Sequence, residues 1–283
     1  MEQSPKINDG PPICARKPHR YSHHGIEITD PYHWLRDPDY PRVRDQEILQ
    51  YLNAENTYFE SVLAKQQITI DKLFSEFKER IPSKDFSVPL KDGNYRYQTQ
   101  WVKEAQYPKY VRWTTKENEY APKNIETILD CEALAGVGDY FALGSLSISH
   151  DHRFLSYGVD TSGSERFTLS IKDLDTGVVL KDSIENVQGD VVWSTDNTSF
   201  FYLVCNNQWR PHQLKLHVLD TRVEDDPIIY QETDEAFFLD LNITSSKRYV
   251  VLSTGDHVTT ESYVIRADSP KTDPVLICKR KSG

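Results

Sequence analysis

A repeated pattern of strand, polar turn and strand is the feature of this sequence that most constrains its fold. Three copies of the pattern read SISHDHRFLSYG, VWSTDNTSFFYL and NITSSKRYVVLS. Their turns begin at Ser149, Ser194 and Thr244, so the copies are spaced by 45 and then 50 residues, and PLKDGNYRYQTQ from Pro89 is a candidate earlier copy. This spacing is typical of four-stranded β-propeller blades. A helical repeat would need amphipathic stretches that the region lacks, and an immunoglobulin-type sandwich would not repeat its own sequence.

From Lys84 onward, short runs of alternating apolar and polar residues predict strands, and turn sequences separate them. The clearest runs are Tyr95–Trp101, Phe167–Leu174, Phe200–Val204 and Tyr249–Ser253. Residues 84–283 number 200, which at about 48 per blade make about four blades. We therefore expect a mainly β chain with an incomplete β-propeller. It is cut short after a last blade whose final VLICKRKSG leaves little room for an outer strand.

The residues before this region predict a helical segment. Apolar residues recur at helical spacing from about 42 to 66, and again at i, i+3, i+4, i+7 and i+11 from Ile70 to Ile81. Pro82 ends the second helix, because the residue before a proline is pushed out of the helical region. The sequence therefore predicts two parts, residues 1–83 and residues 84–283.

Composition excludes several classes of protein. Asp and Glu outnumber Lys and Arg by 43 to 33, which gives a net charge of −10, whereas a nucleic-acid surface needs clustered cations. No run approaches the roughly 18 apolar residues that a bilayer span requires, and the start lacks the apolar core of a secretory signal. We expect a cytoplasmic chain with neither a nucleic-acid nor a membrane partner.

The cysteines and histidines do not predict a metal site. Cys14, Cys131, Cys205 and Cys278 stand singly, without a Cys-x-x-Cys pair or a dense disulfide framework, so we expect reduced thiols. The nine histidines gather mainly at 19–24 and 150–152, but neither group offers further ligands at suitable spacing on a helix. We expect no metal and no cofactor.

Four short motifs follow one another in a fixed order. They are HG at His24–Gly25, WLRD at Trp34–Asp37, YL-x-x-EN at Tyr51–Asn56 and RIP at Arg80–Pro82. Together they resemble the amino-terminal part of the prolyl oligopeptidase family of serine peptidases, with the oligopeptidase B branch most similar. The resemblance implies a helical segment that packs on a carboxy-terminal α/β-hydrolase domain, with a seven-bladed propeller inserted between them. It also implies a serine-type endopeptidase that cuts short peptides after Arg or Lys, in which the propeller excludes folded proteins by size.

Catalytic residues cannot be assigned to this chain. It contains no Gly-x-Ser-x-Gly sequence, the strand-to-helix turn that exposes a serine nucleophile in such hydrolases. The resemblance places the triad, the hydrolase domain and about three blades beyond Gly283. We therefore leave open whether the chain is an enzyme, and expect it to be inactive alone. The hydrolase domain and short peptide substrates are its expected partners.

The aromatic cluster of Tyr32, Trp34 and Leu35 beside the two helices has a structural interpretation. Such a cluster is more often a packing anchor than a ligand cage. In the resembled family this segment is buried against the hydrolase domain, so here we expect it to leave exposed apolar side chains.

The loop from Asp160 to Arg166, DTSGSER, is the candidate functional stretch. One interpretation is a solvated, glycine-containing turn. In the other, this loop lies on the rim of its blade opposite the turn led by Ser149, and the resemblance places that rim against the hydrolase domain. Glu165, with Asp160 and Arg166, would then serve in substrate gating or at the domain interface, pairing with an arginine of that domain or with a peptide amino group. Glu185, expected to follow the outer strand of the same blade, is a comparison residue.

Two other functions remain open. The chain could be a free-standing interaction module that binds proteins through its propeller surface, but it lacks the Gly-His to Trp-Asp pattern of WD40 repeats and retains the HG to WLRD segment. It could also be an accessory subunit that docks with a separate hydrolase chain.

Overall fold

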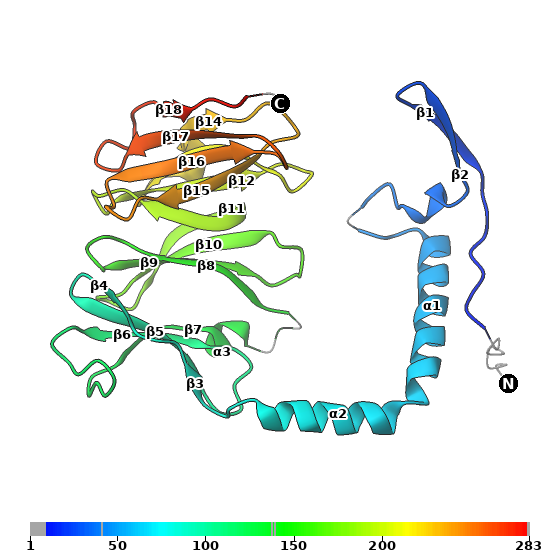
Figure 1. Ribbon diagram of the computed structural model, residues 1–283, viewed down its shortest axis with the longest axis horizontal. Coiled ribbons are helices and arrows are strands. Elements are labelled where there is room, and N and C mark those ends of the chain that lie inside the picture. The colour runs from blue at the N-terminus through cyan, green and yellow to red at the C-terminus, as the bar shows by residue number, and fades with distance from the viewer. Residues whose placement is uncertain (1–9, 41, 137, 139, 282–283) are drawn as a thin grey trace. The chain divides into compact units, whose positions relative to one another are not determined.

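The structure, a computed structural model, describes residues 10–40, 42–136, 138 and 140–281. The chain divides into two compact units, Met1–Pro82 and Ser83–Gly283. Figure 1 shows two long helices in the first unit and a series of antiparallel sheets in the second.

The first unit begins with a β-hairpin that the sequence analysis did not predict. Strands β1 (His19–His23) and β2 (Ile26–Asp30) pair along their full length, from His19 opposite Asp30 to His23 opposite Ile26. His24 and Gly25 form the two-residue connection with φ values of 52° and 76°, as a type I′ turn requires. The 3-10 turn η1 (His33–Leu35) follows.

The predicted helices are confirmed as α1 (Gln46–Ala64) and α2 (Gln67–Arg80). Helix α1 starts a few residues later than expected because Asp45 caps it, accepting hydrogen bonds from the backbone N–H groups of residues 47 and 48. The carboxylate of Asp37 fixes the preceding turn by accepting three backbone N–H bonds, which lower its pKa. Helix α2 ends before Pro82, as predicted.

Trp34 is the packing anchor of this unit. Its Nε1–H donates to the carbonyl oxygen of Ala15 at 2.8 Å, its ring meets that of Tyr51 edge-on at 6.3 Å, and Lys17 Nζ lies 4.5 Å from the ring centre. Both helices leave large apolar side chains exposed, among them Leu52, Phe59, Leu73, Phe74 and Phe77. In the aromatic segment itself, for which exposed apolar side chains were predicted, Tyr32 is exposed, while Trp34 and Leu35 are half-buried.

The second unit consists of four blades of four strands each, counting β3 and β4 as one broken inner strand. Blade 1 comprises β3 (Asp85–Phe86), β4 (Leu90–Asp92), β5 (Tyr95–Trp101), β6 (Lys109–Thr114) and β7 (Glu126–Asp130), which is followed by α3 (Cys131–Ala135). Blade 2 comprises β8 (Ala142–Ile148), β9 (Phe154–Asp160), β10 (Phe167–Asp173) and the first part of β11 (Val179–Trp193). Blade 3 comprises the rest of β11, β12 (Ser199–Cys205), β13 (Pro211–Val218) and β14 (Ile228–Gln231), with the 3-10 turn η2 (Val223–Asp225) before β14. Blade 4 comprises β15 (Phe238–Ile243), β16 (Tyr249–Gly255), β17 (Thr260–Arg266) and β18 (Val275–Cys278).

The last of these strands corrects an expectation. The sequence predicts too little room for an outer strand in the carboxy-terminal tail. The residues VLIC of this tail nevertheless form β18, which pairs with β17 from Val264 opposite Val275 to Ser262 opposite Cys278. The tail suffices because an outer strand of four residues is enough to complete this blade. The predicted mainly β fold with about four blades is otherwise confirmed.

Strand β11 belongs to two blades at once. Residues from Val179 to Val187 pair with β10, and residues from Val187 to Trp193 pair with β12. Gly189, with a φ of 108°, lies between Val187 and Val191, where the register of the pairing with β12 shifts. Blades 2 and 3 consequently form one seven-stranded sheet. Glu185 therefore lies inside this strand, and the expectation that it follows the outer strand is wrong, because the strand continues into the next blade.

The core lies between successive blades. One apolar cluster, centred on Ile128 and Leu155, joins blades 1 and 2. A second, around Trp193 and Ile171, joins blades 2 and 3, and a third, around Phe201 and Leu252, joins blades 3 and 4. Each blade turns an apolar face toward each neighbouring blade. The strands of the blades in the middle of the array are therefore buried on both sides.

The repeated turns have the same geometry in all three copies. The third residue after the leading Ser or Thr donates its N–H to the leader's carbonyl oxygen, at 2.9, 3.2 and 2.7 Å. That third residue has a φ between 57° and 65° in each copy: His152, Asn197 and Lys247. The sequence repeat is therefore a structural repeat.

Antiparallel pairing puts the loops of each blade alternately on two rims. One rim carries the repeated turns. The other, which we call the entry rim because the first strand starts there just after Ser83, carries the loops 102–108, 161–166, 206–210 and 256–259. The predicted loop lies on the entry rim, opposite the turn led by Ser149, as the sequence analysis expected.

Candidate functional site: a pocket at the entry rim

Asp160 builds the candidate loop. This residue ends β9 and is only 1 % exposed. Its Oδ1 accepts hydrogen bonds from Ser162 N, Ser162 Oγ and Gly163 N at 2.7, 2.8 and 3.1 Å, and its Oδ2 accepts one from Glu165 N at 2.7 Å. Burial alone would raise the pKa of Asp160, but these hydrogen bonds outweigh it and lower the pKa. Asp160 is thus a positioning residue whose carboxylate is already occupied by its own loop.

Glu165 is presented to the outside by this arrangement. Its backbone is held in the left-handed region, with a φ of 57°, by the hydrogen bond from its N–H to Asp160. The side chain is exposed, and among the described residues its carboxylate has no hydrogen-bond or ion-pair partner. A non-glycine residue with this φ is strained, so holding Glu165 in this conformation costs conformational free energy.

Arg166 lies against the neighbouring blade. Its guanidinium carbon is 4.7 Å from the ring centre of Trp209, within cation–π range, and its Nη1 is 3.5 Å from Asn186 Oδ1. Trp209 also has a positive φ, of 67°, in a loop that Asn206 organises through its carbonyl oxygen and its side chain. Two strained rim loops therefore meet through Arg166 and Trp209.

These loops surround a pocket of about 520 Å³, a size typical of small-ligand sites. Its walls combine aromatic, acidic and amide side chains from blades 2, 3 and 4: Tyr140, Phe167, Trp209, Phe238, Glu165, Asp240 and Gln188. The Oε1 atom of Gln188 is buried without a partner among the described residues. The lining also includes Arg166, but the three carboxylates of Asp160, Glu165 and Asp240 outnumber this one guanidinium, which favours a cationic guest.

A further acidic residue lies on β11, two positions after the pocket residue Gln188. Asp190, on the part of β11 that belongs to blade 3, is half-buried and has no hydrogen-bond or ion-pair partner within the described residues. Burial, and then the charge of Asp240, raise the pKa of its carboxyl. The first strands of blades 3 and 4 thus each carry a carboxylate, and the charge of Asp240 acts on that of Asp190.

The sequence contained a signal for these residues that the analysis above missed. Asp190 and Asp240 each stand four residues before the turn leader of their repeat, and Ser145 occupies the same position in the preceding copy. Aligning the copies beyond their turns would have identified one equivalent position on three inner strands. Trp209 carried no such signal, because only the fold brings it to Arg166.

We expect Asp190→Asn to stabilise the second unit. A carboxyl with a raised folded pKa opposes folding when it is ionised, so the variant should gain most at neutral pH and nothing below the unfolded value of about 3.9. Because solvent screens a half-exposed group, we expect a gain of roughly 0.5–1 kcal/mol, or about 2 °C in melting temperature. Thermal unfolding at pH 7 and pH 4 measures it, and an equal gain at both values would contradict the electrostatic cause.

All three predicted site residues, Asp160, Glu165 and Arg166, line the pocket, and Asp160 also holds the backbone of Glu165. Their role in gating or at a domain interface stays a prediction. Within the described ranges, no group of three or more His, Cys, Asp or Glu side chains could hold a metal ion. None of the described helices is long and apolar enough to cross a bilayer.

Comparison with known proteins gives consistent matches. Residues 12–283 match the family model described as "Prolyl oligopeptidase, N-terminal beta-propeller domain". The sequence is 32% identical to dipeptidyl aminopeptidase BI of Pseudoxanthomonas mexicana over 94% of this chain and 38% of the relative. It is 31% identical to protease 2 of Moraxella lacunata over 96% of this chain and 39% of the relative.

The fold is similar to that of oligopeptidase B from Leishmania major, with a TM-score of 0.89 and 25% sequence identity. That match covers 98% of this chain and 40% of the other. The chain thus spans about two fifths of the length of these relatives.

Proposed function

This chain belongs to the prolyl oligopeptidase family as its N-terminal β-propeller part, and from this premise we propose that it gates peptide access to a serine-type α/β-hydrolase domain. The observation that carries the proposal is the carboxylate of Glu165, which Asp160 holds at the entry rim and which no described residue pairs with. The polypeptide enters the propeller at this rim, so a domain connected there would meet these loops first.

The substrate class belongs to the proposal. We propose short peptides cut after Arg or Lys, supported by the similarity to oligopeptidase B and by the excess of carboxylates over guanidinium groups in the rim pocket. The hydrolase domain is the proposed partner, and a cytoplasmic location is proposed with it. Four free cysteines, at positions 14, 131, 205 and 278, support a reducing compartment.

The chain alone should hydrolyse nothing. Acyl transfer needs a nucleophile, a base and an oxyanion site in mutual contact, and the sequence has no nucleophile elbow. A serine-directed fluorophosphonate probe should therefore leave the purified chain unlabelled. Stoichiometric labelling of one serine together with peptidase activity would refute this expectation.

Glu165→Gln tests the gating role in the full-length enzyme. The change keeps the size of the side chain and removes its charge. If Glu165 pairs with a partly desolvated arginine or a peptide ammonium, the pair contributes on the order of 1–3 kcal/mol to the closed arrangement, whereas an exposed pair contributes less than about 1. We expect a several-fold fall in kcat/KM on short basic peptides, with stronger salt dependence and an unchanged melting temperature.

Glu185→Gln is the matched control, because Glu185 is an exposed glutamate in the same blade outside the rim pocket. It should leave kcat/KM unchanged. Equal kinetics for both variants and the wild type would make the loop a solvated turn and end the gating proposal.

A further inference from the structure

The rim pocket, the pocket of about 520 Å³ at the entry rim, contains two separate pairs of an aromatic ring and a carboxylate. Phe238 and Asp240 form one pair on β15 of blade 4, where both are exposed and, being two positions apart, leave the strand on the same face. Tyr140 and Glu165 form the other pair, at blade 2. The ring of Tyr140 lies against the candidate loop, with carbons 3.7–3.8 Å from where a Cβ atom on Gly163 would stand. Blades 2 and 4 thus each contribute one ring and one negative charge to the pocket.

These rings and carboxylates are available to a guest. Phe238 is 50% exposed and Tyr140 is 43% exposed, and an exposed ring gains free energy when a guest covers it. Neither Glu165 nor Asp240 forms an ion pair with a described residue. The carboxylate of Asp240 accepts a hydrogen bond from Asn242 Nδ2 at 2.6 Å, through its Oδ2 atom. Both carboxylates therefore retain capacity to accept hydrogen bonds from a cation.

The same pocket already holds one guanidinium group, that of Arg166. Its central carbon lies 4.7 Å from the ring centre of Trp209, and it forms no ion pair with a described carboxylate. A planar guanidinium stacks on aromatic rings and offers two parallel N–H groups to a carboxylate. The ring and carboxylate of Phe238 and Asp240 are therefore suited to a second guanidinium, brought by a guest.

The charge of the lining favours such a guest. At neutral pH, the three carboxylates of the lining and the one guanidinium leave a net charge of −2. Asp160 is engaged by the backbone of its own loop, so Glu165 and Asp240 are the carboxylates that face a guest. The volume of the pocket lies in the range typical of small-ligand sites, which is sufficient for one long side chain.

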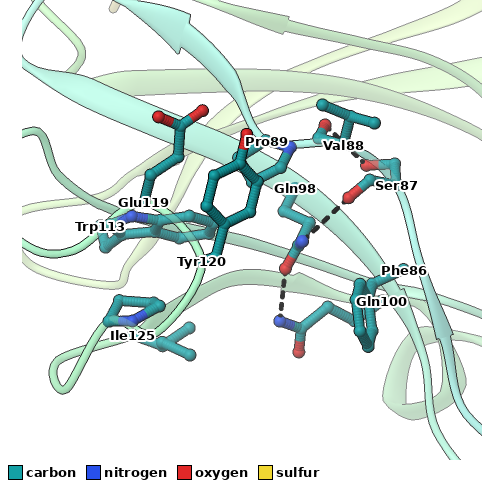
Figure 2. Close-up of a pocket in the computed structure, with 11 residues that line it drawn as sticks. Phe86, Ser87, Val88, Pro89, Gln98, Gln100, Trp113, Glu119, Tyr120 and Ile125 are labelled. Atoms are coloured by element: carbon teal, nitrogen blue, oxygen red, sulfur yellow. Dashed lines mark hydrogen bonds between the residues drawn. The ribbon is translucent and has the colours of Figure 1, made fainter.

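A second pocket, of about 330 Å³ in blade 1, has a different lining (Figure 2). Glu119, the one carboxylate in this lining, forms an ion pair with Arg96 at 3.4 Å. Gln98 Nε2 donates to Ser87 O and Gln100 Nε2 donates to Gln98 Oε1, both at 2.8 Å, as the dashed lines in Figure 2 show. In contrast to the rim pocket, the described lining of this pocket has no unpaired charge for a basic side chain.

We propose that the rim pocket is a subsite for one arginine side chain of a bound peptide. Asp240 accepts hydrogen bonds from the guanidinium, the ring of Phe238 covers one of its faces, and Glu165 adds a second negative charge. This arginine is not the residue at which the peptide is cut, because the subsite belongs to the propeller, which has no nucleophile elbow. The subsite rests on the proposed function in taking a peptide as the guest, and it adds a second basic residue to the substrate class.

Nuclear magnetic resonance of the indole N–H groups tests the binding on the 283-residue chain. Trp209 lines the pocket, and Trp209→Phe assigns its signal among those of the five tryptophans. Titration with acetyl-Gly-Ser-Arg-Ser-Gly-amide, whose blocked ends leave arginine as its one charged group, should shift this signal saturably. Citrulline in place of arginine keeps the shape and removes the charge, and should weaken binding at least about tenfold. Lysine, which lacks the planar fork, should bind severalfold more weakly than arginine.

Variants at exposed positions locate the guest. Asp240→Asn and Glu165→Gln should each weaken binding of the arginine peptide severalfold, because each removes one negative charge and keeps the size of the side chain. Phe238→Leu should also weaken it severalfold, because leucine has no ring for the guanidinium to stack on. Asp273→Asn is the matched control, since Asp273 is an exposed aspartate of the same blade in the loop before β18, outside the pocket. It should bind the peptide as the wild type does, and all four variants should keep the melting temperature of the wild type within about 3 °C.

Three results would overturn the subsite: no saturable shift at Trp209, equal affinity for the arginine and citrulline peptides, or equal affinity of Asp240→Asn and Asp273→Asn for the arginine peptide. The full-length enzyme separates the subsite from gating. There, a second arginine in the peptide should raise kcat/KM severalfold for the wild type and not for Asp240→Asn. A fall in kcat/KM for Glu165→Gln without any such gain from the second arginine would retain the gating proposal and reject the subsite.

Discussion

Replacing His217 with leucine should cost the second unit about 3–5 kcal/mol of unfolding free energy, the usual result of removing one partner from a buried ionic network. His217 is fully buried on β13, with its Nδ1 2.9 Å from an oxygen of Asp226 and its Nε2 2.9 Å from Asp182 Oδ1. Tyr202 OH donates to Asp226 at 2.8 Å. With both ring nitrogens facing carboxylates, the imidazole is held as the cation. Leucine would leave two buried carboxylates without a counterion.

The unfolding free energy that His217→Leu removes should depend on pH in a defined direction. Burial alone would lower the pKa of His217, but hydrogen bonds to Asp226 and Asp182 outweigh it and raise the pKa. A raised folded pKa means that the stabilisation is complete below the unfolded value of about 6.5 and is lost as the pH rises through the folded value. Urea unfolding of the wild type and the variant should therefore differ most at pH 6 and less in alkaline buffer.

His257→Leu is the control, because His257 is exposed in the rim loop 256–259. Its unfolding free energy should stay within about 0.5 kcal/mol of the wild type. A His217→Leu protein as stable as this control would show that the network contributes nothing to folding.

Arg280→Met, close after the last strand of blade 4, should lower the unfolding free energy of the second unit by a similar amount. The guanidinium of Arg280 lies 2.6 Å from Glu232 Oε2 and 3.3 Å from Glu261 Oε1, and 4.0 Å from the ring centre of Phe237. Both glutamates are nearly buried, and Thr254 Oγ1 also donates to Glu232 at 2.7 Å. Methionine keeps much of the stem and removes the charge, so two carboxylates lose their counterion at an expected cost of about 3–5 kcal/mol.

Lowering the pH should reduce the difference in unfolding free energy between the wild type and Arg280→Met. Burial would raise the pKa of Glu232, but its hydrogen bonds, including that from Arg280, lower it, and the pKa of Glu261 is lowered by Tyr263 and Arg280. A lowered folded pKa contributes stability that is present above the unfolded value of about 4.3 and is lost as the pH falls. Urea unfolding of wild type and variant should consequently converge below about pH 4.

Arg222→Met provides the comparison, since Arg222 pairs with Glu224 at 3.4 Å on the surface, where both side chains are more than 70% exposed. Such pairs contribute about 0–1 kcal/mol. If the two methionine variants lost the same stability, burial of the Arg280 cluster would not be the cause.

The blades were predictable because their turns impose local requirements. Each repeat needs a Ser or Thr leader and a residue that tolerates a positive φ three positions later, and both are visible in the sequence. The hairpin at 19–30 was not predictable from apolar alternation, because β1 is exposed at every position and β2 at most of its positions. Its turn residues alone, His24 and Gly25, indicated its centre.

The candidate site was predictable only in part. The loop at 160–166 stood out by its polar residues and glycine, and its place on the rim followed from counting strands. The residues that surround this loop could not be predicted. Arg166 contacts Trp209, which is 43 positions away in the sequence, and only the packing of the blades brings the two together. The network around His217 was equally hidden, because an isolated histidine between apolar residues gives no sign of two carboxylates across the sheet.

The double use of β11 has a consequence for how the propeller can open. Between blades 1 and 2, and between blades 3 and 4, the described strands do not pair, whereas one hydrogen-bonded ladder runs from β8 to β14. Amide hydrogens along that ladder should exchange with solvent together, as a single cooperative unit, while blades 1 and 4 can exchange separately. A hinge in this propeller can thus lie between the first and second blades or between the third and fourth, but not between the second and third.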